Sequence, residues 1–140
     1  MNKQTPLREI MTTKVQKVQE LDTLERVAYL FEKYDFHHIP VEDEEANLVG
    51  IVSRADFNTL SYGLSLFGNP DKEIYNQALY KTTLVRDVMT KIVVNLRPED
   101  PASFAARIFG ENLFHALPIV ESGKLVGIVT TFDLLKMAFR

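Results

Sequence analysis

A short segment of this chain occurs twice with little change, and that repeat constrains the fold more than any other feature. Residues 48–56 read LVGIVSRAD, and residues 125–133 read LVGIVTTFD. The first five residues are identical in both copies, and each copy then has a serine or threonine three positions before an aspartate. A fold assembled from two such units is expected to have a pseudo-twofold axis. A cleft on that axis would suit one or two small ligands.

The similarity extends upstream, and a change of register within it locates a turn. The aspartates that end the two copies are 77 positions apart, whereas Met11 and Met89, near the start, are 78 apart. The register changes in the polar segment 42–47, which lies opposite 121–124 of the second copy. Both segments are typical of hairpin turns, where a change in length costs little. A change of length confined to a turn supports a true structural repeat.

Hydrophobic spacing predicts the order β-α-β-β-α in each copy, an α/β fold that other schemes class as α+β. The first copy is expected to have a strand at 15–18 and then a helix capped by Asp22. The second copy is expected to have a strand at 92–95 and then a helix capped by Asp100, with Pro101 at its first position. The later strands are predicted at 38–42, 48–53, 116–120 and 125–130, and the closing helices from 53 or 54 and from 131.

This order divides the chain into a first unit at 1–57, a connector at 58–83 and a second unit at 84–140. The connector has no counterpart after the second copy. It is predicted to form a helix, a turn at 68–71 and a second short helix. Its apolar residues need a surface to pack on, and that surface is either the module itself or a second subunit.

Composition narrows the class of function. The 140 residues are 46% hydrophobic, which suits one compact domain with a sizeable core. The net charge is −3 with both signs interspersed, so nothing supports binding to nucleic acid or to a membrane. The chain has no cysteine, and no spacing of its three histidines suits a metal ion. Residues 1–6 lack the apolar core that is expected of a signal peptide. We therefore predict a cytoplasmic protein that lacks a catalytic motif and is not an enzyme.

The two copies together resemble a known family. Each has Met-Thr, then a helix, then His-x-[Ile/Leu]-Pro-[Val/Ile], and then Leu-Val-Gly-Ile-Val-[Ser/Thr]-x-x-Asp. This pattern is similar to a tandem pair of CBS domains over 7–57 and 84–135. The resemblance implies a Bateman module, with two units packed through their sheets about a pseudo-twofold axis. Its two clefts, in many relatives, bind AMP, ADP, ATP or S-adenosylmethionine. The resemblance also implies a homodimer and, for a stand-alone module, an unknown protein target regulated in trans.

The repeated serine or threonine and aspartate are the candidate ribose ligands. Ser53 and Asp56, like Thr130 and Asp133, stand where a strand becomes a helix. A carboxylate there can accept hydrogen bonds from both ribose hydroxyls, and the N–H groups of the helix terminus attract a phosphate. The same spacing also forms a capping box, which needs no ligand. The two roles are compatible, and both remain open.

The candidate phosphate ligands differ between the copies. Arg54 follows Ser53, and a guanidinium there would suit a phosphate, whereas its counterpart is Thr131. The alternative for Arg54 is a solvated helix residue. We expect the first copy to bind phosphate better. The resemblance adds His37, His38 and His115 to the phosphate ligands, although a histidine at a strand edge also serves as a structural residue, and it assigns Thr12, Val15, Thr90 and Val93 to the adenine base.

Two functions from different classes follow. The first is a regulatory module that senses an adenosine-containing nucleotide and modulates a partner. The second is a ligand-free structural module whose role is dimerisation, with the apolar connector filling an interface or a cleft.

Overall fold

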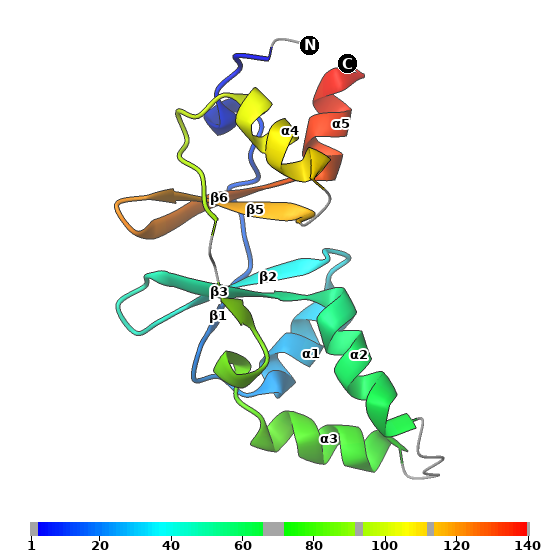
Figure 1. Cartoon of the computed structure of the whole chain (residues 1–140). Helices are drawn as coiled ribbons and strands as arrows, with labels where there is room; N and C mark the ends of the chain where they lie inside the picture. Colours follow the sequence, from blue (N-terminus) through cyan, green and yellow to red (C-terminus); the bar gives the residue numbers. More distant parts are fainter. Residues whose placement is uncertain (1–2, 66–71, 92–93, 112–113, 140) are drawn as a thin grey trace. The chain divides into compact units, whose positions relative to one another are not determined.

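A computed structural model describes the chain at 3–65, 72–91, 94–111 and 114–139 (Figure 1). The chain divides into two compact units, which we name by their helices. The α1–α3 unit comprises Gln16–Glu45 and Val49–Ile92, and the α4–α5 unit comprises Met1–Val15, Ala46–Leu48 and Val93–Arg140.

The α1–α3 unit contains a sheet in the order β1-β2-β3-β4. Its outer pairs are β1 (Val18–Gln19) parallel to β2 (His38–Glu42), and β3 (Leu48–Ser53) antiparallel to β4 (Thr90–Lys91). The strand predicted at 15–18 is therefore shorter and later than expected. The helical elements of this unit are α1 (Leu24–Lys33), α2 (Arg54–Ser65), α3 (Lys72–Thr82) and the 3-10 turn η2 (Val85–Asp87).

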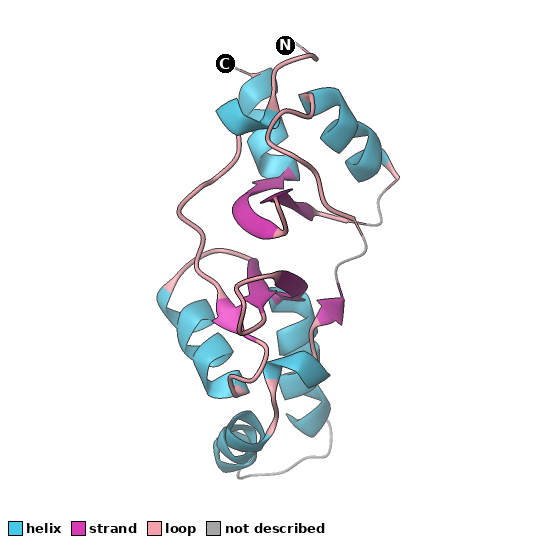
Figure 2. Ribbon diagram, turned by 90° about the vertical axis from the view of Figure 1, so that its left-hand side faces the viewer, coloured by secondary structure: helices cyan, strands magenta, loops and turns pink. Residues whose placement is uncertain are grey.

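The α4–α5 unit repeats this arrangement with shorter outer pairing (Figure 2). Its hairpin joins β5 (Ala116–Glu121) antiparallel to β6 (Lys124–Thr130). A single bridge from Leu96 to Ile119 takes the place of the pairing between β1 and β2, and a single bridge from Thr12 to Ile128 takes the place of the pairing between β3 and β4. Of the strand predicted at 92–95, residues 92 and 93 lie outside the described residues. The helical elements are η1 (Leu7–Glu9), α4 (Ala102–Gly110) and α5 (Thr131–Ala138).

The first helix of each repeat begins one residue later than predicted. Asp22 and Asp100 are not the cap residues of α1 and α4, so that part of the prediction was wrong, and Pro101 is itself the N-cap residue. Each carboxylate instead closes the preceding turn. Asp22 Oδ2 accepts a hydrogen bond from the Gln19 amide at 2.9 Å, and Asp100 Oδ2 accepts one from the Arg97 amide at 2.8 Å.

Each compact unit contains the opening segment of the other repeat. Leu7 is fully buried in the core of the α4–α5 unit, and its amide donates to the Asp100 carbonyl at 2.9 Å. Val85 is fully buried in the core of the α1–α3 unit, and its amide donates to the Asp22 carbonyl at 2.8 Å. The compact units therefore cut across the sequence repeats, and each repeat contributes to both hydrophobic cores.

The glycine shared by the two repeated strands makes room for this exchange. A Cβ on Gly50 would lie 2.9 Å from the Thr90 carbonyl oxygen, and a Cβ on Gly127 would lie 3.0 Å from that of Thr12. Each would also overlap the thioether of the methionine that precedes the threonine. The repeated Met-Thr therefore packs directly against the repeated glycine, and this close contact occurs once in each unit.

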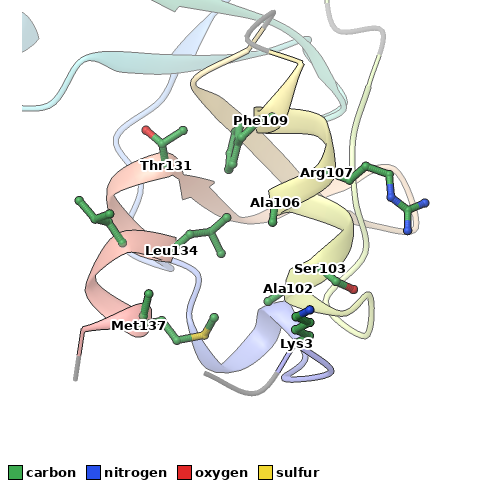
Figure 3. Close-up of a pocket in the computed structure, with 12 residues that line it drawn as sticks. Lys3, Ala102, Ser103, Ala106, Arg107, Phe109, Thr131, Leu134 and Met137 are labelled. Atoms are coloured by element: carbon green, nitrogen blue, oxygen red, sulfur yellow. The ribbon is translucent and has the colours of Figure 1, made fainter.

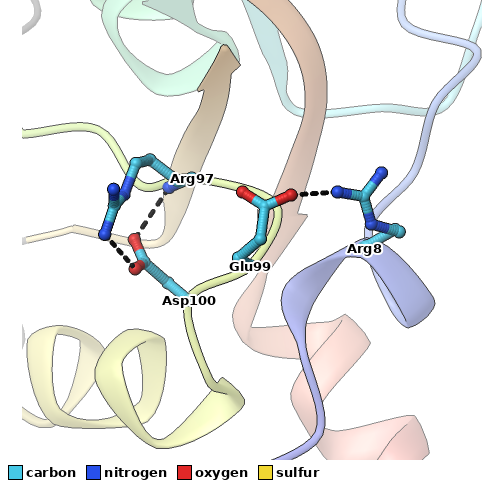
Figure 4. A network of polar contacts seen from close by, with 4 residues as sticks. All are labelled: Arg8, Arg97, Glu99 and Asp100. Atoms are coloured by element: carbon cyan, nitrogen blue, oxygen red, sulfur yellow. Dashed lines mark hydrogen bonds and ion pairs between the residues drawn. The ribbon is translucent and has the colours of Figure 1, made fainter.

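Charged side chains surround the exchanged segment of the α4–α5 unit (Figure 4). Arg8, on η1, forms an ion pair with Glu99. Arg97 Nη2 lies 3.5 Å from Asp100 Oδ1 on the same loop. Most of these side chains are exposed, so each pair contributes about 1 kcal/mol or less. Burial of Leu7, rather than charge, is the larger contribution to holding this segment.

The connector forms the two predicted helices, α2 and α3, and its predicted turn at 68–71 lies outside the described residues. The Tyr80 ring of α3 stacks on Phe57 of α2 with their centroids 5.1 Å apart. Leu60 also packs against the core of the α1–α3 unit. The connector therefore packs at least in part on its own unit. Within the described ranges, no helix is both long and apolar enough to cross a bilayer.

Candidate functional site

A pocket of about 550 Å³ lies beside the first turns of α2 in the α1–α3 unit. Asp56 belongs to the first turn of this helix, and Thr90 belongs to β4. The structure therefore brings a predicted ribose ligand and a predicted base ligand to one pocket, although they come from different repeats. The pocket is lined by Asp56, Thr59, Leu60, Val88 and Thr90.

A pocket of about 490 Å³ lies at the equivalent place in the α4–α5 unit. Three lining residues of this pocket lie 77 positions after lining residues of the first pocket: Asp133 after Asp56, Lys136 after Thr59, and Met137 after Leu60. A fourth pair, Ile10 and Val88, is 78 positions apart, as Met11 and Met89 are. Because the two pockets use matching positions, they are a property of the repeat. The second pocket is lined by Glu9, Ile10, Asp133, Lys136, Met137 and Phe139.

The aspartates of the two pockets differ in how they are engaged. Asp133 is buried and completes a capping box, with its amide donating to Thr130 Oγ1 at 3.2 Å and its Oδ2 accepting from the Thr130 amide at 2.9 Å. Asp56 is exposed, and its amide donates to Ser53 Oγ at 3.0 Å. The capping role is thus complete at the second aspartate. The predicted ribose contacts stay a prediction.

Arg54 is directed into its own unit. Its Nε and Nη2 donate to the Phe36 carbonyl at 3.1 and 2.8 Å, and Nη2 also donates to the carbonyls of Phe31 and Tyr34 at 3.0 and 2.9 Å. The guanidinium carbon lies 4.7 Å from the centre of the Phe31 ring. Arg54 therefore ties the end of α1 to the start of α2. Its predicted phosphate contact stays a prediction and would have to compete with these four hydrogen bonds.

The predicted phosphate histidines lie next to the helix starts. The Arg54 amide donates to the His37 carbonyl at 2.7 Å, and the Thr131 amide donates to the His115 carbonyl at 3.3 Å. Both histidine side chains are exposed, and that of His38 is half-buried. The backbone thus brings each histidine to the residue that begins the second helix of its repeat.

Of the predicted base ligands that the structure describes, Thr90 lines one of the two pockets, whereas Thr12 and Val15 line neither. Thr90 lines the first pocket, as described above. Thr12 exchanges backbone hydrogen bonds with Ile128 at 2.9 and 3.0 Å, which places it beside β6 in the α4–α5 unit. Val15 is half-buried at the end of its segment, and Val93 lies outside the described residues.

The residues that reasoning from the sequence missed are one helical turn beyond each aspartate. Thr59 and Lys136 occupy this position in the two pockets. They differ in identity and stand outside the repeated motif, so a search for identical residues passes over them. The signal that could have found them was the register of 77 continued beyond Asp133.

Comparison with known proteins identifies the repeat. The family model described as CBS domain matches residues 7–61 and 85–140. The fold is similar to the CBS domain of a CBS domain containing membrane protein from Sphaerobacter thermophilus, with a TM-score of 0.80 and 34% identity over 96% of this chain and 88% of that one. It is also similar to CBSX2, solved in complex with AMP, with a TM-score of 0.76 and 26% identity over 96% of each chain.

A curated relative shows the domain as part of a larger protein. Inosine-5'-monophosphate dehydrogenase of Methanocaldococcus jannaschii is 30% identical over 129 residues, which is 91% of this chain and 22% of that enzyme. The chain therefore spans less than a quarter of the length of that relative. Two matches of the family model, a shared register and a structural likeness along nearly the whole chain agree. The chain belongs to the CBS domain family and contains two copies of the domain in tandem.

Proposed function

We propose that this chain is a regulatory module that binds an adenosine-containing nucleotide of the AMP, ADP or ATP type and alters the activity of a protein partner in trans. The observation that carries the proposal is the pair of equivalent pockets, each with the repeated aspartate on its wall. The complex of the similar protein CBSX2 with AMP supports the choice of ligand class.

The pocket of the α1–α3 unit has the groups that a nucleoside needs. The exposed Asp56 carboxylate is a charged acceptor for ribose hydroxyls, and such charge-assisted hydrogen bonds contribute about 1.5–3 kcal/mol. Leu60 and Val88 provide apolar walls, and Thr90 adds a hydroxyl beside them. A site with apolar walls and a few polar groups is the usual form of a small-molecule site.

The pocket of the α4–α5 unit has a different charge balance. Lys136 Nζ lies 3.9 Å from Asp133 Oδ1, and Lys136 replaces the threonine of the other pocket. Because Asp133 also serves the capping box, a ligand here would share its carboxylate with the backbone. We therefore expect the two pockets to bind the same nucleotide with different affinities.

Calorimetry against AMP, ADP, ATP, NAD and S-adenosylmethionine tests the proposal. We expect binding tighter than millimolar for at least one of them. Asp56→Ala is expected to weaken one site by about tenfold or more, the equivalent of one charge-assisted hydrogen bond. Glu44→Ala, an exposed change in a turn of the same unit, is the matched control. No binding by any of the five compounds would exclude a nucleotide sensor.

The second site needs a control for helix stability. Asp133→Ala removes both the carboxylate and half of the capping box, whereas Thr130→Ala breaks the box and keeps the carboxylate. We expect both variants to lose stability and Asp133→Ala to lose more affinity than Thr130→Ala, because the charged carboxylate is the stronger of the two predicted ribose ligands. Equal loss of affinity in both variants would mean that the carboxylate acts through the helix and not on the ligand.

The alternative function is a ligand-free structural or dimerisation module. The complete capping box at Asp133 favours it, because a buried aspartate with backbone partners needs no ligand. The same titrations separate the two functions. A chain that assembles but binds none of the five compounds would support the alternative.

A further inference from the structure

The helix α5 lines two separate hollows of the α4–α5 unit. A groove of about 630 Å³ lies between α4 and α5, and Thr131 and Leu134 of α5 line it (Figure 3). Asp133 and Lys136 instead line the pocket of about 490 Å³ described above. The Lys136 side chain therefore belongs to the pocket at Asp133, whereas Thr131, a predicted phosphate ligand, lines the groove.

The charged group that a ligand meets beside the repeated aspartate differs between the two pockets. In the α1–α3 unit it is the exposed carboxylate of Asp56, and Thr59, one helical turn later, is neutral. In the α4–α5 unit the Asp133 side chain is 9% exposed, and its Oδ2 already accepts a backbone hydrogen bond. The Lys136 side chain is 60% exposed. A ligand therefore meets an ammonium group where the other pocket offers a carboxylate.

Neighbouring groups on α5 keep the Lys136 ammonium at the pocket without a close hydrogen bond. Its Nζ lies 3.9 Å from Asp133 Oδ1 and 5.0 Å from the centre of the Phe132 ring. The first distance is about 1 Å longer than a charge-assisted hydrogen bond. The ammonium can therefore donate to an anion on the ligand while Asp133 Oδ1 accepts from a hydroxyl beside that anion.

We propose that the pocket of the α4–α5 unit selects an adenine nucleotide that carries a phosphate on the 2′ or 3′ oxygen of its ribose, with Lys136 as the specificity-determining residue. This inference rests on the proposed function. A ribose with one hydroxyl and one phosphate matches the Asp133 acceptor and the Lys136 donor, whereas a ribose with two hydroxyls matches the Asp56 carboxylate. In dinucleotide-binding folds, a cation in place of the ribose-binding carboxylate likewise accommodates a 2′-phosphate.

Glu9 opposes this selection and gives it a directional test. Glu9 is exposed on η1 and lines the same pocket. Its carboxylate repels a phosphate, so Glu9→Gln should tighten the binding of a ribose-phosphorylated nucleotide several-fold. A cationic ligand would respond in the opposite direction. Weaker binding of the phosphorylated nucleotide by Glu9→Gln would therefore overturn the inference.

Calorimetry on the full chain carrying Asp56→Ala, which weakens the first pocket, tests the selection. The ligands are AMP, adenosine 2′,5′-bisphosphate and adenosine 3′,5′-bisphosphate. We expect one bisphosphate to bind about tenfold or more tightly than AMP. Lys136→Thr, which introduces the residue of the other pocket, should bring this ratio close to unity. Lys14→Thr, at an exposed lysine of the same unit outside both pockets, is the matched control and should keep the ratio.

The outcomes separate this inference from the proposed function. Binding of AMP with no preference for either bisphosphate would overturn the inference and leave the nucleotide sensor standing. A preference that survives Lys136→Thr would also overturn it. No binding of any of the three compounds would overturn both.

Transfer of the lysine gives a second readout that leaves α5 unmodified in sequence near Lys136. Thr59→Lys places an ammonium one turn after Asp56, at the position that Lys136 has in the other pocket. Measured with Asp133→Ala, which weakens the second pocket, this variant should gain affinity for the preferred bisphosphate relative to AMP. A loss of affinity for the bisphosphate relative to AMP would contradict the assignment of selectivity to this position.

Discussion

The α1–α3 unit and the α4–α5 unit place a pocket at the same position of the repeat, but they differ in how the surrounding helices are held. In the α1–α3 unit, Arg54 ties α1 to α2 and the helix α3 covers both. In the α4–α5 unit, a complete capping box starts α5, and the groove beside it is open. The aspartate is exposed in the first unit and buried in the second.

The comparison distinguishes the residues that are identical in the two copies from those that differ between them. Two parts are identical in both copies: the glycine of the repeated strand and the methionine of the opening segment. They form the contact between that strand and the opening segment exchanged from the other repeat. The parts that differ, such as Thr59 and Lys136, line the pockets. The shared residues therefore maintain the scaffold. We propose that ligand preference depends on the residues that the repeat does not share.

The largest expected effect tests the exchange of opening segments. Leu7→Ala removes a fully buried leucine and should cost about 2–5 kcal/mol of folding free energy. Because Leu7 lies in the core of the α4–α5 unit, amide hydrogen exchange should rise in α4 and α5 more than in α1. Val85→Ala is the mirror test and should affect α1 first. Faster exchange in α1 after Leu7→Ala would contradict the exchanged arrangement.

The next effect tests the backbone contact that both units share. Gly50→Ala and Gly127→Ala each place a methyl group against a carbonyl oxygen and a methionine, and overpacking of this kind costs about 1–3 kcal/mol. We expect similar losses in urea denaturation, because the two contacts are nearly the same. Gly110→Ala is the control, since a Cβ there would meet no atom within 4 Å. A loss at Gly110 equal to the other two would mean that the cost is not steric.

The third effect separates the structural role of Arg54 from its predicted phosphate role. Arg54→Met keeps the aliphatic stem but removes the donors to three carbonyls, and we expect a loss of about 2 kcal/mol in urea denaturation. Thr131→Ala, at the exposed equivalent position, should change stability by about 0.5 kcal/mol or less. If Arg54→Met leaves stability unchanged but weakens nucleotide binding, the phosphate role is the better description.

Much of the fold could be predicted from the sequence, because the repeat is carried by buried strands with a clear period. The strand at 48–53 was predicted with its observed bounds and the strand at 125–130 to within one residue, and the family was confirmed. The exchange of opening segments could not be predicted. Matching Met11 with Met89 shows that the two are equivalent, but a spacing does not tell which core each segment enters.

The candidate site was predictable only where its residues are repeated. Asp56 and Asp133 stand out because they recur, whereas Lys136 does not match Thr59 and was missed. Arg54 was assigned to a phosphate from its side chain alone. Its observed acceptors are backbone carbonyls, which leave no trace in the identity of the residues that carry them.

The smallest effect returns to the comparison between the two helix starts. Thr130→Ala breaks a capping box in which both hydrogen bonds are present, and this should cost about 1 kcal/mol. Ser53→Ala removes the acceptor for the Asp56 amide and should cost about 0.5 kcal/mol, because Arg54 also holds the start of α2. Thermal denaturation of both variants, with and without Arg54→Met, measures this dependence. If the start of α2 relies on Arg54, Ser53→Ala should lower the stability more in the Arg54→Met background than in the unmodified chain. Strictly additive losses of stability would show that the Ser53 hydroxyl and the Arg54 guanidinium act independently.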